Sequence, residues 1–187
     1  MESDILLIRE RQATDIADFD RIVDLHRKQV YGLAYQLTGN HEDADDISQE
    51  VFIRAYRSIR KFRGKAKIST WLYRITVNLS INYMKKKLKY AHEHTDEEAF
   101  DGKADPIVPE QPGDPLQEIE AEELAQGIRM ATESLPVKEK TVFILRVNQD
   151  LPYKEIARIL DCPIGTVMSR LNRARRKLRD KLRNYIV

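Results

Sequence analysis

The sequence lacks most features that enzymes, secreted proteins and membrane proteins carry. One cysteine in 187 residues excludes an internal disulfide and fits a reducing cytoplasm. No apolar run reaches the roughly eighteen residues of a membrane span, and no leader with a cleavage site is found. Gly-rich phosphate loops, His-Glu-x-x-His helices and nucleophile elbows are also missing. We therefore expect a cytoplasmic protein that is not an enzyme, inserts into no membrane and needs no cofactor.

Candidate metal ligands are few as well. Histidine occurs four times, and His92 and His94 stand among acidic residues, where two imidazoles can touch a metal ion. Histidines in a polar segment are far more often solvated, and Cys162 is best explained as a small buried residue. We expect no metal site.

What the chain does have is charge, and this charge is sorted by segment. The 32 basic and 30 acidic residues nearly cancel, for a net charge of +2. Yet residues 51–90 hold twelve basic residues and no acid, residues 91–114 hold eight acids against Lys103, and residues 162–187 hold eight basic residues against Asp180. Two basic blocks around an acidic spacer indicate two surfaces that meet nucleic acid.

Apolar residues recur at helical spacing in three segments of the first half, and no alternating strand pattern competes with them. Gly39 ends the first predicted helix, Asn40 caps the second, and Ser69 and Thr70 cap the third. The first stripe comprises Phe19, Val23, His26, Val30, Leu33 and Leu37. The second comprises Ala44, Ile47, Val51 and Ala55, and the third comprises Leu72, Ile75, Leu79 and Tyr83.

The second half repeats this organisation after a linker. Residues 91–114 combine glycine, proline and acids with few large apolar groups, which is typical of flexible linkers. Helices resume near Pro115, and another helix runs through residues 142–147. The side expected to pack carries Leu116, Ile119, Leu124, Ile128 and Leu135. The sequence thus predicts an all-α fold with two small helical domains, 1–90 and 115–187, joined by the acidic flexible linker.

Residues 151–176 have the pattern of a helix-turn-helix, which places its second helix in the major groove of DNA. The first helix has an apolar face of Ile156, Ala157 and Leu160. Asp161 tolerates the left-handed backbone of a tight turn, and the second helix is expected to begin near Pro163. An ordinary helical hairpin with a basic, solvated face is the alternative.

The two faces of this second helix follow from the period of 3.6 residues. The buried stripe comprises Val167, Leu171, Ala174 and Leu178. The opposite face comprises Gly165, Ser169, Asn172 and Arg176, flanked by Met168 and Arg173. Side chains on the opposite face can reach base edges or phosphates, while Lys154 and Arg158 on the first helix can hold the DNA backbone.

The segment 42–56 buries one stripe and exposes charged residues on its other sides, a pattern that suits a charged partner helix. The exposed residues are Asp43, Asp45, Asp46, Gln49 and Glu50, followed by Arg54 and Arg57. An ordinary solvated acidic face is the alternative.

The segment 62–82 interleaves aromatic rings with cations, a combination that favours single strands whose bases are unstacked. The rings are Phe62, Trp71 and Tyr73, the cations are Arg63, Lys65, Lys67 and Arg74, and Asn78 and Asn82 follow on the same helix. Because a flipped base needs a shaped pocket, we expect the loop 62–68 to form its rim. Trp71 as a plain core residue is the alternative.

Three motifs together resemble one protein family over nearly the whole chain. In order, and around the acidic linker, they read DADDISQEVFIRAY, FRGKAKISTWLYRITVNLSINY and LPYKEIARILDCPIGTVMSRLNRARRKL. This combination closely resembles the extracytoplasmic-function (ECF) sigma factors of bacteria, small sigma-70 family members that keep only region 2 and region 4. The resemblance implies a stress-response factor that binds RNA polymerase core, directs promoter-specific initiation and is held inactive by an anti-sigma factor, often at the membrane.

The resemblance also implies roles for individual residues. The set that would dock on the polymerase clamp helices is Asp43, Asp45, Asp46, Gln49, Glu50, Phe52, Arg54 and Arg57. The set that would melt the −10 element and hold an unstacked base is Phe62, Arg63, Lys65, Lys67, Trp71, Tyr73, Arg74, Asn78 and Asn82. The set that would read the −35 element as duplex is Lys154, Arg158, Thr166, Met168, Ser169, Asn172, Arg173 and Arg176. The polymerase flap region would be a further partner.

Two residues depart from the family pattern. Met168 stands where the family usually carries lysine or arginine, so one DNA contact of the family pattern lacks its cation. Pro152 replaces the serine or threonine that caps the first helix of the motif, although proline is tolerated at a first turn. The alternative function is a stand-alone helix-turn-helix regulator, which would need a dimerisation surface that matches half-sites about 34 Å apart.

Overall fold

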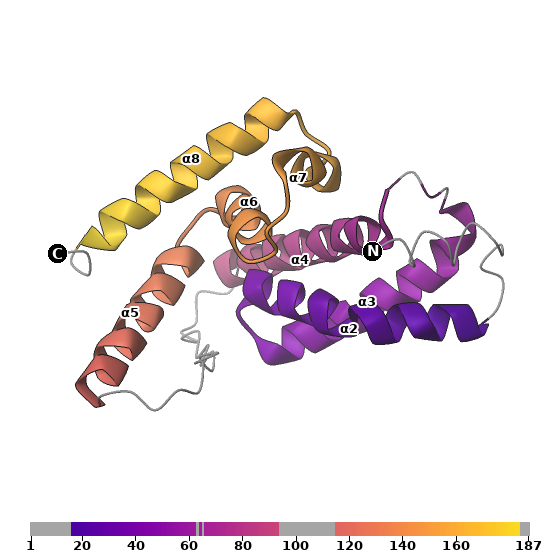
Figure 1. The fold of residues 1–187 in the computed structure, drawn as a ribbon, viewed down its shortest axis with the longest axis horizontal. Helices are drawn as coiled ribbons and strands as arrows, with labels where there is room; N and C mark the ends of the chain where they lie inside the picture. The colour runs from indigo at the N-terminus through magenta and orange to yellow at the C-terminus, as the bar shows by residue number, and fades with distance from the viewer. Residues whose placement is uncertain (1–15, 63, 65, 94–114, 184–187) are drawn as a thin grey trace. The chain divides into compact units, whose positions relative to one another are not determined.

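The computed structural model describes residues 16–62, 64, 66–93 and 115–183, and every regular element in these ranges is a helix (Figure 1). The predicted all-α class is therefore confirmed. The chain divides into two compact units, one mainly within residues 1–100 and the other mainly within residues 101–187. None of the described helices combines the length and apolar character of a membrane span.

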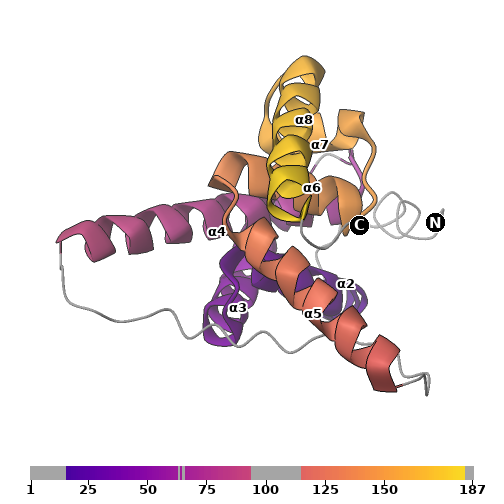
Figure 2. The ribbon, with the colours of Figure 1, turned by 90° about the vertical axis from the view of Figure 1, so that its left-hand side faces the viewer.

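Three long helices and a short 3-10 turn build the first unit. They are α2 (Ile16–Thr38), α3 (His41–Ser58), η1 (Ile59–Lys61) and α4 (Ile68–Glu93). Helices α2 and α3 form a hairpin, and α4 packs against both (Figures 1 and 2). Since α4 continues to Glu93, it extends past the predicted start of the linker, and residues 94–114 lie outside the described residues.

The hairpin turn has the two signals that the sequence predicts. Gly39 adopts a positive φ of 73°, and its N–H donates to the Tyr35 carbonyl at 2.7 Å, which ends α2. The Asn40 side chain accepts from the Asp43 N–H at 2.9 Å, which satisfies a free donor at the start of α3. Both helix boundaries are therefore confirmed.

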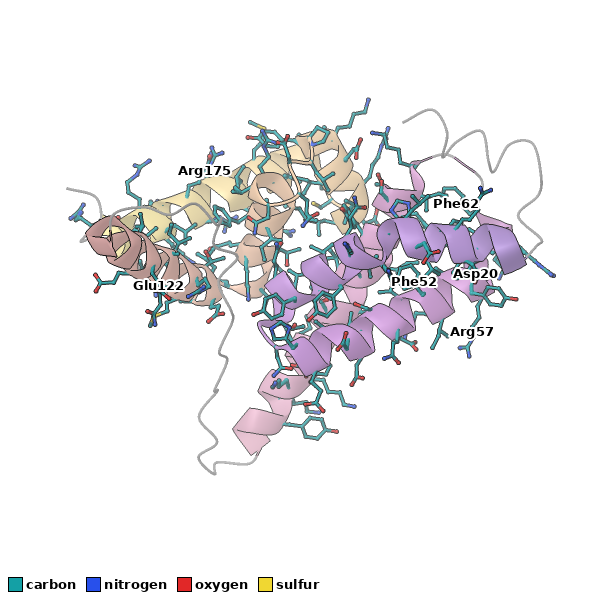
Figure 3. The ribbon with its side chains drawn as sticks, turned by 60° about the horizontal axis from the view of Figure 1, so that its bottom comes forward. Asp20, Phe52, Arg57, Phe62, Glu122 and Arg175 are labelled. Atoms are coloured by element: carbon teal, nitrogen blue, oxygen red, sulfur yellow. The ribbon has the colours of Figure 1, made fainter. Side chains whose placement is uncertain are left out.

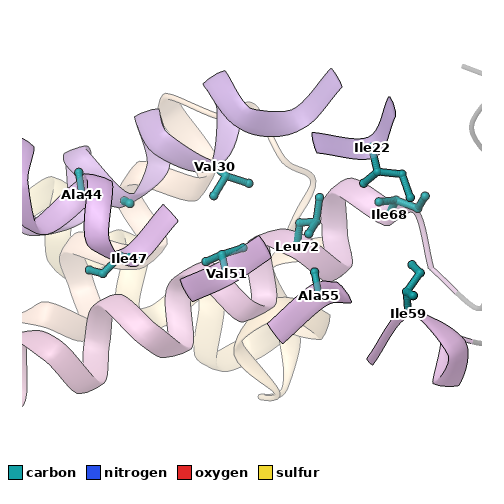
Figure 4. Close-up of a cluster of buried hydrophobic side chains, with 10 residues drawn as sticks. Ile22, Val30, Ala44, Ile47, Val51, Ala55, Ile59, Ile68 and Leu72 are labelled. Carbon is teal, nitrogen blue, oxygen red and sulfur yellow. The ribbon is translucent and has the colours of Figure 1, made fainter. Parts of the chain in front are cut away.

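The core of the first unit lies between the three helices (Figure 4). The stripe of α3 is buried as predicted, at Ala44, Ile47, Val51 and Ala55. It packs with residues from the neighbouring helices, namely Ile22, Val30, Ala34, Ile59, Ile68 and Leu72. Helical periodicity therefore identified the buried side of α3 correctly.

The predicted cap of α4 is wrong. The helix begins at Ile68, and the Trp71 N–H already donates to the Lys67 carbonyl at 3.1 Å, so Ser69 and Thr70 lie inside the first turn. Ile68 is 6% exposed and belongs to the core cluster, and its burial extends the helix beyond the polar pair. Thr70 is itself buried, at 5% exposure.

Four helices build the second unit. They are α5 (Pro115–Glu133), α6 (Val137–Val147), α7 (Tyr153–Leu160) and α8 (Ile164–Lys181). One buried cluster joins Ala131 and Leu135 to Ala174 and Leu178 of α8, with Phe143 packed against it. The helix start at Pro115 and the helix through residues 142–147 agree with the sequence prediction.

The predicted packing side of α5 is only partly right. Leu135 is buried, but Leu124 and Ile128 are 39% and 42% exposed. The buried residues on this part of α5 are the small Gly127 and Ala131, which let a helix backbone approach closely and leave the larger side chains on the flank. Two further residues of the predicted side, Leu116 and Ile119, have side chains outside the described residues.

Candidate nucleic-acid and partner-binding surfaces

The turn between α7 and α8 has the geometry of a helix-turn-helix. Asp161 adopts a positive φ of 50°, as the sequence predicts. The Cys162 N–H donates to the Ala157 carbonyl at 3.1 Å, and the Pro163 carbonyl accepts from the Thr166 N–H at 2.9 Å at the start of α8. The predicted tight turn is therefore confirmed, although Cys162 is only partly buried.

A set of local contacts also fixes the start of α7. The Arg146 guanidinium lies 2.6 Å from the Asp150 carboxylate, and its carbon sits 5.8 Å from the centre of the Tyr153 ring. The Pro152 carbonyl accepts from the Ile156 N–H at 3.1 Å, so the helix begins there without a side-chain cap. The departure at Pro152 thus leaves the motif folded.

Helix α8 separates into the two predicted faces. All four stripe residues are buried: Val167, Leu171, Ala174 and Leu178. The opposite residues are exposed: Gly165, Met168, Ser169, Asn172, Arg173 and Arg176. Lys154 and Arg158 on α7 are exposed too, and Thr166 is half-buried. We call the predicted set of eight residues on α7 and α8 the duplex-reading surface, after the role that the sequence predicts for it.

An ion pair joins α8 to α6. The Lys177 ammonium lies 2.8 Å from the Glu139 carboxylate of α6, whose side chain is 10% exposed. Next to it, burial lowers the pKa of Lys140, and the negative charge of Glu133 opposes this shift in part. Glu139 of α6 therefore pairs with the packed side of α8, while Arg173 and Arg176 of α8 are exposed.

The acidic residues at the start of α3 differ in exposure: Asp43 makes contacts with α4, and its acidic neighbours are exposed. The Asp43 carboxylate accepts a hydrogen bond from the Tyr83 hydroxyl and lies 3.2 Å from the Lys87 ammonium, both on α4. With its side chain 13% exposed, Asp43 faces the unit's interior. Asp45 and Asp46, by contrast, are fully on the surface.

The rest of the α3 surface mixes charge with apolar area. Its exposed residues are Gln49, Arg54 and Arg57, and its half-buried residues are Glu50 and Phe52. Figure 3 labels Phe52 and Arg57. The Arg54 guanidinium lies 2.6 Å from the Glu50 carboxylate, an exposed pair that adds only about 0.3–0.5 kcal/mol to stability.

The sequence prediction missed two apolar residues on this surface. Ile53 is 44% exposed, and Tyr56 is 51% exposed with its ring edge-on to Phe19 at 5.2 Å. Helical geometry offered the signal, because Ile53 lies roughly opposite the buried Val51. Apolar groups among charges make this surface better suited to a protein partner than an acidic face alone.

A second surface of the first unit surrounds the start of α4. The Phe62 and Trp71 rings lie 5.0 Å apart at 40°, and both pack against the core while staying partly exposed. Gly64 adopts a positive φ of 65° in the loop between them. Ser58, Lys61, Ala66, Thr70 and Arg74 of the same unit lie around the two rings. The core-only alternative for Trp71 is therefore incomplete.

Polar residues continue this surface along one side of α4. Lys67, Arg74, Asn78 and Asn82 are exposed, whereas Arg63 and Lys65 lie outside the described residues. Tyr73 is 6% exposed, and burial raises the pKa of its hydroxyl, so its ring belongs to the core and does not reach a ligand at the surface. We call the residues that are at least partly exposed the strand-opening surface, after the role that the sequence predicts for them: Phe62, Lys67, Trp71, Arg74, Asn78 and Asn82.

Comparisons with known proteins decide the family. Residues 22–89 match the family model of sigma-70 region 2, and residues 125–178 match that of sigma-70 region 4. The chain is 36% identical over 184 residues to the ECF RNA polymerase sigma factor SigW of Bacillus subtilis, covering 95% of both proteins. The chain belongs to the ECF sigma factors. It is also 35% identical over 187 residues to the ECF sigma-E factor of Haemophilus influenzae, covering 96% of this chain and 95% of that protein.

Two solved structures share the fold of this chain. The sigma factor RpoE of Bartonella quintana, crystallised with the anti-sigma factor NepR, aligns with a TM-score of 0.69 at 24% identity over 90% of this chain and 98% of the other. CnrH, in complex with the cytosolic domain of CnrY, aligns with a TM-score of 0.67 at 19% identity over 97% and 98%. Sigma factors are generally non-enzymatic transcription initiation factors, and the predicted family and function class are confirmed.

This ECF sigma factor brings no metal ligands together in the described part of the chain, where no three His, Cys, Asp or Glu side chains cluster. The side chains of His92 and His94 lie outside the described residues. The roles of the three predicted residue sets stay predictions.

Proposed function

We propose that this ECF sigma factor binds RNA polymerase core through α3, opens promoter DNA with the strand-opening surface and reads an upstream element with the duplex-reading surface. The observation that carries the proposal is the division of α8, whose four-residue stripe is buried while its polar and basic face is exposed. A helix held in this way can enter a major groove without losing its own core. Region 2 corresponds to the predicted domain 1–90 and region 4 to 115–187.

The exposed part of α3 is the proposed polymerase surface. Asp45, Asp46 and Gln49 supply charge and hydrogen bonds, and Ile53 and Tyr56 supply apolar area. Such a mixture supports docking on the clamp helices of the largest polymerase subunits, with the flap region as the partner of region 4. Asp43 is left out of the docking set, since α4 occupies its carboxylate.

The strand-opening surface is proposed to hold single-stranded promoter DNA. The Phe62 and Trp71 rings offer stacking faces, and Lys67 and Arg74 lie within the same stretch for phosphate contacts. Stacking of a base on an aromatic ring contributes about 1–3 kcal/mol, which offsets the few kcal/mol needed to unstack it.

An anti-sigma protein is the proposed regulator. Two structural neighbours were solved in complex with an anti-sigma factor or a cytosolic domain, and the exposed apolar residues of α3 give such a partner a place to bind. The factor would then act in the cytoplasm and be held at the membrane when its regulator is membrane-bound. A protein that copurifies with the chain from its own cells should suppress transcription when it is added back to the purified factor.

Run-off transcription with purified core polymerase tests the proposal. Templates carrying the region upstream of the chain's own gene should yield a discrete transcript only when the chain is present. If polymerase gains no promoter-specific initiation on this or any candidate promoter, the proposal fails. Operator binding by a dimer without polymerase would instead favour a stand-alone regulator.

A further inference from the structure

The first two turns of α8 differ in chemistry from the rest of the helix. Residues 164–169 hold no charged side chain, whereas residues 170–183 hold eight basic residues against one acid. The N-terminal residues of a recognition helix are those that contact base edges. The end of α8 suited to reading bases is therefore uncharged, and the cations follow where phosphates are within reach.

Two large apolar side chains stand exposed at this uncharged end. Ile164 is 44% exposed and Met168 is 48% exposed, one helical turn apart on the same side of α8. Four residues after Met168, Asn172 is exposed as well. Packing inside the second unit does not account for either apolar side chain, because the buried stripe runs through Val167 and Leu171.

Gly165, between these two side chains, gives an independent indication of a close ligand. A Cβ placed on Gly165 would meet no atom within 4 Å, and its φ is not in the positive range. Neither packing nor backbone conformation therefore requires glycine here, although glycine weakens a helix. Glycine at an exposed helix position lets another molecule approach the backbone closely.

The chemistry of the major groove identifies what this end of α8 can read. Guanine is read by arginine or lysine, adenine by asparagine or glutamine, and thymine by apolar contact with its C5-methyl group. Arginine and lysine are absent from residues 164–169. Resting on the proposed function of the duplex-reading surface, we infer that Met168 and Ile164 recognise thymine methyl groups in the upstream promoter element, with Gly165 allowing the close approach. The eight basic residues that follow supply the charge complementary to the DNA backbone.

Replacing thymine with uracil tests this inference, because the exchange removes only the methyl group. Polymerase holoenzyme containing the full chain first selects its preferred upstream element from a random duplex library. Each thymine of that element is then exchanged for uracil in turn. Wild-type holoenzyme should lose about three- to fivefold in affinity at one or two positions, the factor expected for one buried methyl group.

Variants assign the methyl contact to residues. At the thymine that Met168 contacts, the affinity of holoenzyme with Met168→Ala should not change when thymine is exchanged for uracil. Holoenzyme with Met168→Leu should retain most of the wild-type loss in affinity. Val147→Ala is the matched control, since Val147 is an apolar residue of similar exposure, 52%, at the end of α6 and is not one of the residues of the duplex-reading surface. It should behave as wild type.

The possible outcomes separate this inference from the function on which it rests. Three outcomes would overturn the inference and leave upstream reading intact. Wild type and Met168→Ala could lose affinity equally at every thymine, the wild type could lose affinity at no thymine, or the selected element could contain no thymine. If the holoenzyme selects no upstream element at all, upstream reading itself fails.

Discussion

The Tyr83 hydroxyl of α4 donates a hydrogen bond to the Asp43 carboxylate of α3, across 40 positions of sequence. The Lys87 ammonium, one turn further along α4, lies 3.2 Å from the other oxygen of the same carboxylate. The Asn40 side chain accepts a hydrogen bond from the Asp43 backbone N–H at 2.9 Å. These contacts fix the start of α3 against α4, so Asp43 positions the helix that carries the proposed polymerase surface.

Substitutions of two neighbouring acids should therefore have different consequences. Asp43→Asn should lower the free energy of unfolding by about 1 kcal/mol, because a charge-assisted hydrogen bond becomes a neutral one. Asp46→Asn, at an exposed position, should change stability by less than about 0.5 kcal/mol but weaken binding to polymerase core. Urea denaturation and a core-binding titration measure the two effects. Our assignment of Asp43 is wrong if folded Asp43→Asn loses core affinity as strongly as Asp46→Asn.

The same hydrogen bond makes stability depend on pH in the alkaline range. Bonding to Asp43, with burial and nearby acidic charges as lesser causes, raises the pKa of Tyr83 from 10.0 to about 12. Because the folded state favours the protonated phenol, this stabilisation is complete below about pH 10 and is lost as the pH rises toward about 12. Tyr83→Phe should lower the free energy of unfolding by about 1 kcal/mol at neutral pH.

Urea denaturation across this pH range provides the measurement. The stability difference between wild type and Tyr83→Phe should shrink as the pH rises toward about 12, since deprotonation removes the same bond in the wild type. Comparing the two proteins cancels the shared titration of Tyr73 and Tyr31, whose pKa values are also raised. A difference that stays constant across the range would contradict the account.

Duplex binding and strand opening should respond to different substitutions. Arg173→Ala and Arg176→Ala should each weaken holoenzyme binding to duplex promoter and reduce the slope of log affinity against log salt by about one unit per lost phosphate contact. Trp71→Ala should spare duplex binding and impair strand opening. Filter binding over a salt series and permanganate reactivity of unpaired thymines report the two activities. Equal loss of both activities in all three variants would show that the division of labour is misassigned.

Gly165→Ala should separate stability from binding. Since a Cβ at this position meets open space and the φ of Gly165 is not positive, the variant should be at least as stable as the wild type in its free energy of unfolding. Its affinity for duplex promoter as holoenzyme should fall, because the added methyl group stands where DNA approaches α8. Thermal denaturation and duplex titration check the pair of results. A variant at least as stable as the wild type and with unchanged affinity would remove the support that Gly165 lends to a close approach.

Patterns local to one helix were predictable from the sequence. The buried stripes of α3 and α8, the positive φ at Gly39 and Asp161, and the Asn40 cap each depend on residues within a few positions of one another. Periodicity and turn chemistry depend on residues at that range, so these features can be predicted from the sequence alone. The exposed face of α8 followed from the same geometry.

Features that depend on contacts between helices were not predictable in this way. The start of α4 at Ile68 depends on a pocket built by other helices, and the partners of Asp43 come from a helix that is distant in sequence. On α5, periodicity marked an apolar side but did not show that the small Gly127 and Ala131 would be the buried residues. Tyr73 shows the same limit, because composition suggests a stacking ring and packing places it in the core.

The most direct test of the account compares transcription from closed and pre-opened promoters. Core polymerase with the wild-type chain should initiate at one position on fully paired promoter duplex. With Trp71→Ala it should initiate there only when the strands near the start site are mismatched beforehand, because duplex reading is intact and strand opening is lost. The absence of a promoter-specific transcript with the wild-type chain would contradict the proposed function, and so would a pre-opened template that does not restore initiation by Trp71→Ala.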